Sequence, residues 1–131
     1  MRVESVVDLL REASLGSRPL DAMVAQAIGW RKIDRLIRDE RTGEVRDKTL
    51  WLIPNSNDPG RLPLYTSNIE AAYLLVQQVR SSAVSGFSWQ DKSATAQVGE
   101  GGPRVTAATP ALAICLAALM TVASEAVRNE H

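Results

Sequence analysis

Two alanine-rich segments, each preceded by a helix start signal, constrain the fold of this chain more than any other feature. The first follows Tyr65-Thr66-Ser67-Asn68, and the second follows Thr106-Ala107-Ala108-Thr109. In the second, Thr109 is the expected N-cap and Pro110 the first helical residue, where the missing N–H of proline costs nothing. A thin, apolar, alanine-rich helix is seldom left facing water. We therefore expect it to be buried against a sheet or against its copy in a homo-oligomer.

The first alanine-rich helix carries a capping signal of its own. Ser67 and Glu70 have the spacing of a capping box, in which each side chain bonds a free backbone N–H at the helix start. The residues expected to form its buried stripe recur with helical periodicity: Ile69, Ala72, Tyr73, Val76 and Val79.

Length and composition exclude several classes of protein. A chain of 131 residues can bury the core of a single domain without a disulfide or a structural metal. Its 15 basic residues balance 15 acidic ones, so no net charge attracts nucleic acid. Cys115, the single cysteine, lies among apolar residues and is expected to be buried and inert. With one histidine, His131, the chain offers no metal site, and we expect no cofactor.

The remaining helices predict one soluble domain over residues 1–131. The segment Arg2–Ser14 is amphipathic and interrupted by acidic residues, so it predicts a helix rather than a signal peptide. A second helix is expected to restart at Ser17-Arg18-Pro19 and to end at Gly29. The last helix is shorter than the roughly 20 apolar residues of a membrane span. We expect an N-terminal helix at 1–16, a core at 17–126 and a frayed tail at 127–131.

Between Trp30 and Pro54 the pattern changes to two strands joined near Thr42-Gly43. Basic and acidic residues alternate over residues 31–48, which favours a solvated hairpin protruding from the core over an arm that binds nucleic acid. The apolar run Leu50–Ile53 predicts a strand covered on both faces. The charged hairpin could also bind a protein partner.

Two further strands are predicted from alternation after residue 86. Phe87 and Trp89 share one face of the first, and a face of the second carries three small apolar residues, Ala94, Ala96 and Val98. The alternate positions are polar: Ser88, Gln90, Thr95 and Gln97. That face is therefore wet, or it faces a ligand. The order of elements predicts an α+β fold, with helices packed on a small antiparallel or mixed sheet.

No constellation of catalytic residues is visible, so we expect a binding protein rather than an enzyme. The loop Gly99–Arg104 is the first candidate site, because backbone N–H groups at Gly101 and Gly102, the Arg104 guanidinium and the helix start beyond Thr106 suit an anion such as phosphate. The alternative is a turn whose glycines adopt positive φ.

A second candidate site surrounds the start of the first alanine-rich helix. Its polar side chains could bind a ligand, or they could serve only to cap the helix: Arg61, Tyr65, Thr66, Ser67 and Asn68. Trp89 could stack on a purine, although a tryptophan on a strand also suits a core or an interface. These groups would suit a phosphate-plus-base ligand if the fold brings them together.

Four motifs together resemble the phage ABA-sandwich domain family, which consists of short proteins of bacteriophages and prophages. They are Ile28-Gly29-Trp30, Trp51-Leu52-Ile53-Pro54, the helix beginning at Tyr65-Thr66-Ser67, and Thr109-Pro110-Ala111-Leu112-Ala113-Ile114-Cys115. The resemblance covers about residues 20–120. It departs from the family pattern in the order of proline and alanine in the last motif and in a longer hairpin.

The resemblance implies a three-layer helix–sheet–helix sandwich in a phage protein, located in the cytoplasm of the infected bacterial host. By analogy with other small phage proteins, we expect a counter-defence protein that sequesters a nucleotide-derived immune signal, of the cyclic nucleotide or cyclic ADP-ribose type, without catalysis. The alternatives are a structural or assembly accessory and an inhibitor that binds a host defence protein.

Overall fold

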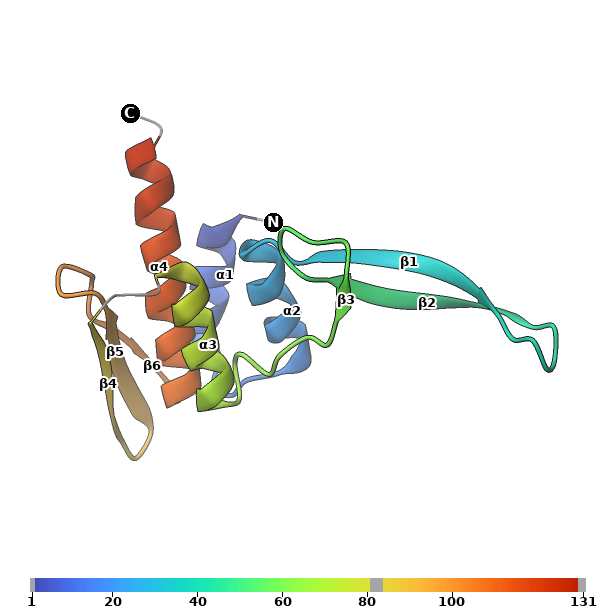
Figure 1. Ribbon diagram of the computed structural model, residues 1–131. Coiled ribbons are helices and arrows are strands. Elements are labelled where there is room, and N and C mark those ends of the chain that lie inside the picture. Colours follow the sequence, from blue (N-terminus) through green and yellow to red (C-terminus); the bar gives the residue numbers. More distant parts are fainter. Residues whose placement is uncertain (1, 81–83, 130–131) are drawn as a thin grey trace.

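The protein, seen in a computed structural model, has an α+β architecture in which one helix forms the centre of the core (Figure 1). The structure describes residues 2–80 and 84–129. In chain order the elements are α1 (Val3–Glu12), α2 (Arg18–Ala27), β1 (Arg31–Arg38), β2 (Val45–Leu52), β3 (Pro59–Gly60), α3 (Ile69–Val79), β4 (Ser85–Gln90), β5 (Ser93–Val98), β6 (Val105–Ala107) and α4 (Pro110–Asn129).

Helix α4 is the central element, and α1, α3, β5 and β6 all pack against it. It begins as predicted, because the Thr109 hydroxyl accepts a hydrogen bond from the Leu112 N–H at 3.2 Å and Pro110 occupies the first turn. Every residue from Ala111 to Leu119 is buried. The predicted burial of this helix is therefore confirmed, and it is achieved within one chain. Its alanines allow close approach on several sides, while Leu112, Leu116 and Leu119 supply apolar volume.

Strands β4, β5 and β6 form one antiparallel sheet beside α4. Ala94, Ala96 and Val98 are buried on the face toward the helices, as the alternation predicted. The helices lie on this one side of the sheet (Figure 1). The opposite face carries the alternate, polar residues of β5.

Strands β1, β2 and β3 form a separate antiparallel sheet, and its two long strands extend away from the helices (Figure 1). The expected single sheet between two helix layers is therefore not the arrangement of the described residues, which have two sheets instead. The reason lies in Leu50–Ile53, which is not covered on both faces. Leu52 is buried, Trp51 is only partly buried, and Ile53 lies outside β2 with 38% of its surface exposed.

The start of α3 differs from the predicted capping box. Asn68, rather than Ser67, is the N-cap, and its side chain accepts a hydrogen bond from the Ala71 N–H at 3.0 Å. The buried stripe is shifted accordingly and consists of Ala71, Ala72, Leu75 and Val76. Ile69 and Tyr73, expected in the stripe, are instead 46% and 58% exposed.

The two N-terminal helices lie where predicted, but each ends two residues earlier, at Glu12 instead of Ser14 and at Ala27 instead of Gly29. Ser17 caps α2 by accepting a hydrogen bond from the Leu20 N–H at 3.3 Å. At the other end, α4 continues through Asn129, and residues 130 and 131 of the predicted tail lie outside the described part. No helix within 2–80 and 84–129 has the length and apolar character needed to cross a membrane.

Candidate functional site

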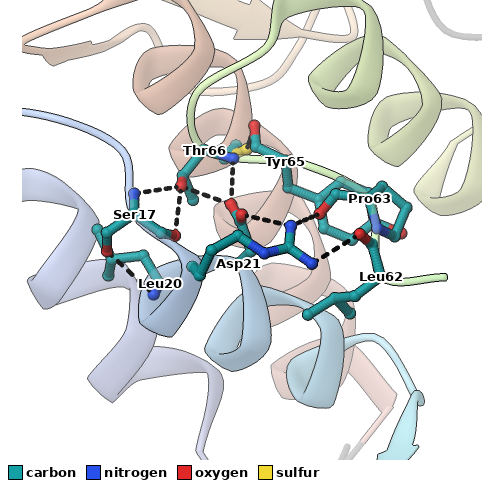
Figure 2. A network of polar contacts seen from close by, with 9 residues as sticks. Ser17, Leu20, Asp21, Leu62, Pro63, Tyr65 and Thr66 are labelled. Carbon is teal, nitrogen blue, oxygen red and sulfur yellow. Dashed lines mark hydrogen bonds and ion pairs between the residues drawn. The ribbon is translucent and has the colours of Figure 1, made fainter. Parts of the chain in front are cut away.

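A buried carboxylate engages Thr66, one of the predicted ligand-binding residues (Figure 2). The Asp21 Oδ1 atom accepts hydrogen bonds from the Thr66 N–H at 2.8 Å and from the Thr66 hydroxyl at 2.6 Å. The same hydroxyl oxygen accepts from the Ser17 N–H at 3.0 Å. Asp21 and Thr66 are both fully buried. Thr66 therefore joins the start of α2 to the segment before α3, and has no face open to a ligand.

Arg18 completes this network from its partly exposed edge. Its guanidinium forms an ion pair with the Asp21 carboxylate at 2.9 Å and donates to the Leu62 and Pro63 carbonyls at 2.9 and 3.2 Å. Two side chains of α2, those of Arg18 and Asp21, therefore link this helix to residues 62–66.

Tyr65 is also structural. Its hydroxyl accepts a hydrogen bond from the Trp30 indole N–H and donates to Gln78 Oε1, each at 3.2 Å. Its carbonyl accepts from the Cys115 thiol at 3.0 Å. Burial raises the pKa of the Tyr65 hydroxyl above its usual range. Burial, with a smaller contribution from the Asp21 charge, likewise raises the pKa of the Cys115 thiol.

Not all of the other polar groups in the predicted cluster before α3 are available to bind a ligand. Asn68 is occupied as the helix cap, and Ser67 is exposed. Arg61 is exposed beside a shallow hollow of about 550 Å³ that also involves Leu64, Asn68 and Leu74. Capping and packing, the alternative considered for this cluster, account for Tyr65, Thr66 and Asn68.

In the loop between β5 and β6, two glycines allow a tight turn of the backbone. Gly99 has φ of +81°, and the Gly102 N–H donates to the Gly99 carbonyl at 3.1 Å. A Cβ atom on Gly102 would lie 2.1 Å from the Val98 carbonyl oxygen. The turn alternative thus explains Gly99 and Gly102, whereas Gly101 is exposed with no neighbour within 4 Å of a Cβ atom. The loop leads into β6, and not directly into the helix as expected.

Arg104 and Thr106 lie on the polar face of the β4–β5–β6 sheet. Thr106 pairs with Thr95 across the strands, and their hydroxyl oxygens are 3.3 Å apart. A hollow of about 530 Å³ is lined by residues of this face and its adjoining loop, among them Ser88, Thr95, Gln97, Glu100 and Arg104. We call these five residues, together with Thr106, the polar sheet face. The ion pairs found among the described residues leave the Arg104 guanidinium unengaged.

Trp89 lies on the other face of the same sheet. It pairs with Ala94, which points toward α4, and cross-strand partners share a face. Trp89 is 70% exposed because α4 covers β5 more than β4. A ligand held by Arg104 on the polar sheet face would therefore not stack on this indole.

The two predicted ligand clusters do not converge. Asn68 caps the start of α3, whereas Arg80, at the other end, lies against Gly99: its Nη1 atom would be 3.1 Å from a Cβ atom there. The 11 residues of α3 separate these ends by about 16 Å. The predicted site around Arg104 remains open to a ligand. In the predicted site around Thr66, the polar groups of Thr66 are already bonded within the protein.

Sequence reasoning missed three groups that matter to these surfaces. Asp21 was overlooked because its partner Thr66 is 45 residues away, and nothing local marks the pair. Arg80 was not singled out, because the residue it lies against, Gly99, is 19 positions further along the chain. The polar residues of β4 and β5 were noted as wet or ligand-facing, and their alternation with Ala94, Ala96 and Val98 was the signal that could have placed them beside Arg104.

No family model, curated protein or solved structure gives a significant match to this chain. Within the described residues, no group of three or more His, Cys, Asp or Glu side chains is placed to hold a metal ion.

Proposed function

We propose that this protein binds a small anionic, nucleotide-derived molecule on the polar sheet face and sequesters it without catalysis. The observation that carries the proposal is the unengaged guanidinium of Arg104 beside a hollow with hydroxyl and amide side chains. A guanidinium presents two parallel donors to a phosphate. Ser88 and Thr95 place hydroxyl groups at this hollow. Gln97 offers its amide oxygen as an acceptor, since its Nε2 already donates to the Gly99 and Glu100 carbonyls. Such groups can bind ribose hydroxyls and base edges.

The biological setting of this proposal comes from the sequence resemblance. A phage ABA-sandwich protein in the cytoplasm of an infected bacterium would act as a counter-defence protein by holding an immune signal such as a cyclic nucleotide or a cyclic ADP-ribose.

A second candidate function is the direct inhibition of a host defence protein through the β1–β2 hairpin. The hairpin extends away from the helices (Figure 1), and it exposes apolar side chains among its charges: Leu36 at 70%, Val45 at 59% and Ile37 at 40%. Such mixed surfaces suit a protein partner better than a small molecule. A structural or assembly role would use the same surface.

The two functions are separated by a thermal-shift panel of cyclic dinucleotides and cyclic ADP-ribose isomers. A ligand present at about 100 times its Kd stabilises the folded state by about 2.7 kcal/mol, which raises the Tm of a domain of this size by roughly 10 °C. The bound compound should be recovered unchanged after heat denaturation. No shift with any nucleotide would refute sequestration, and a degraded compound would indicate an enzyme.

Arginine variants test the location of the site. Arg104→Ala should abolish the ligand-induced shift while changing the apo Tm by less than about 2 °C, since an exposed side chain contributes little to stability. Arg61→Ala is the matched control, because Arg61 is also exposed but lies near α3, away from the polar sheet face. If Arg61→Ala removes the shift and Arg104→Ala does not, the ligand lies near the start of α3.

A further inference from the structure

Strand β4 is an edge strand with none of the features that usually protect such an edge. In the part of the chain that the structure describes, β4 pairs with β5 on one side and with no strand on the other. Natural edge strands avoid unwanted pairing by charged residues, proline or shortness. The sequence Ser85-Gly86-Phe87-Ser88-Trp89-Gln90 contains no charge and no proline. Its backbone N–H and C=O groups are therefore available to a further strand.

The other sheet edges show the contrast. Strand β1 carries charged side chains along its length, at Arg31, Lys32, Asp34, Arg35 and Arg38. Strand β6, at the opposite edge of the β4 sheet, has only three residues. Of the two long edge strands, β1 and β4, only β4 lacks charge, and its exposed aromatic side chains are not interleaved with charged ones as Leu36 and Ile37 are on β1.

That apolar surface lies on the helix-facing side of β4. Phe87 and Trp89 are 40% and 70% exposed, and their ring centroids are 6.0 Å apart. Phe87 lines a groove of about 770 Å³ between β4 and α3, whose other wall includes Ile69, Glu70 and Tyr73. Trp89 lies next to this groove through its contact with Phe87. We call Ile69, Tyr73, Phe87 and the adjacent Trp89 the aromatic groove. The shifted stripe of α3 leaves Ile69 and Tyr73 half exposed beside this groove.

The exposed area is comparable with what a stable dimer needs. An aromatic side chain buries about 150–250 Å², so Phe87, Trp89 and Tyr73 together expose roughly 400 Å² in each copy. Ile69 and the open backbone of β4 add to this. Two copies would bury on the order of 1,000 Å² or more, which reaches the lower range of specific interfaces.

We infer that this protein forms a two-fold symmetric homodimer by antiparallel pairing of β4 with β4 of a second copy. A second copy fits because its β4, like this one, is uncharged and can pair antiparallel with it, so the second strand adds no charge beside Glu70, which lines the groove from α3. Pairing centred on Ser88 places Phe87 of one copy opposite Trp89 of the other, on the helix side. The result is a continuous six-stranded sheet with four aromatic rings between the two α3 helices.

This inference does not depend on the proposed nucleotide site. Edge pairing leaves the polar sheet face uncovered, so the polar sheet faces of the two copies would adjoin across the two-fold axis. The dimer is measured without any ligand, and its failure would leave the Arg104 experiment unaffected.

The mass of the purified protein in solution tests the inference. Light scattering after gel filtration at about 50 µM should give twice the chain mass of 14.2 kDa. Trp89→Glu should convert the dimer to monomer, because it would place charges in the aromatic groove. Leu36→Glu is the matched control, since Leu36 on β1 has the same exposed fraction of 70%, and it should leave the dimer intact. A monomeric wild type, or a dimer broken by Leu36→Glu and not by Trp89→Glu, would overturn the inference.

A cysteine cross-link tests the register. Ser88→Cys adds an exposed thiol, whereas the native Cys115 is buried. Opposed residues of antiparallel strands have Cβ atoms about 4.5–5.5 Å apart, close enough for a disulfide after a small adjustment. Mild oxidation should yield a covalent dimer of Ser88→Cys but not of Ser5→Cys, an exposed position on α1. Equal cross-linking of both variants would mean that random collisions, and not β4 pairing, join the copies.

Discussion

The hydroxyl of Thr66 offers the sharpest test of how the core is joined. Thr66→Val keeps the shape of the side chain but removes a donor to Asp21 at 2.6 Å and an acceptor for the Ser17 N–H at 3.0 Å. Both residues of the Thr66–Asp21 pair are fully buried, so water cannot replace the lost bonds. A hydrogen bond to a charged group contributes about 1.5–3 kcal/mol, and an unsatisfied buried donor costs about 1–3 kcal/mol.

We therefore expect Thr66→Val to lower the free energy of unfolding by about 3 kcal/mol. Thr66→Ser keeps the hydroxyl and deletes one methyl group, which should cost about 1 kcal/mol. Thr106→Val is the isosteric control on the polar sheet face, where the hydroxyl contacts Thr95 at 3.3 Å and is exposed. That change should cost less than about 0.5 kcal/mol.

The measurement is urea unfolding followed by tryptophan fluorescence, with the slope of the transition checked for constancy among the variants. The order Thr66→Val, Thr66→Ser, Thr106→Val, from most to least destabilised, is the expected result. If Thr66→Val were as stable as Thr106→Val, the network in Figure 2 would not be what joins α2 to the segment before α3.

The other predictions concern Gly16 and Cys115. A Cβ atom on Gly16 would lie 2.1 Å from the Thr66 carbonyl oxygen, so Gly16→Ala should cost about 1–3 kcal/mol in the same urea assay. Gly101→Ala, where a Cβ atom meets nothing within 4 Å, should cost less than about 0.5 kcal/mol; equal costs would mean that the segments at Gly16 and Thr66 can separate freely. The Cys115 thiol should not react with a thiol reagent at pH 8 until urea unfolds the protein. Burial raises the pKa of this thiol in the folded state above the ordinary value of 9.0, which applies in the unfolded chain. The contribution of the thiol to stability is therefore complete below pH 9. Above that pH it should decline by about 1.4 kcal/mol per pH unit, and Cys115→Ala should remove this decline. A wild type and a Cys115→Ala variant with the same slope above pH 9 would contradict the assignment.

Local signals in the sequence predicted the boundaries of several elements well. Ser17 and Thr109 each cap a helix where expected, because a cap depends on residues within one turn. The alternation Ala94, Ala96, Val98 placed the buried face of β5 correctly, because the period of a strand is a local property. In both cases the deciding contacts lie within a few residues.

The candidate site was harder to predict because its deciding contacts are distant in sequence. Thr66 carries no local sign of its buried role, which depends on Asp21, 45 residues away. The placing of Trp89 on the face opposite Arg104 required the register of β4 on β5. Nothing in Leu50–Ile53 showed that its strand would join a separate sheet.

The position of α4 has a consequence for the synthesis of the protein. Helices α1 and α3 and strands β5 and β6 all pack against α4, yet α4 follows every one of them in the sequence. While a ribosome makes the chain, Val6 and Leu10 of α1 leave the exit tunnel about 100 residues before their partner helix, roughly 5–20 seconds earlier at common rates of translation. Their apolar side chains have no permanent partner during that interval. The core around α4 can therefore close only after the last helix has been translated.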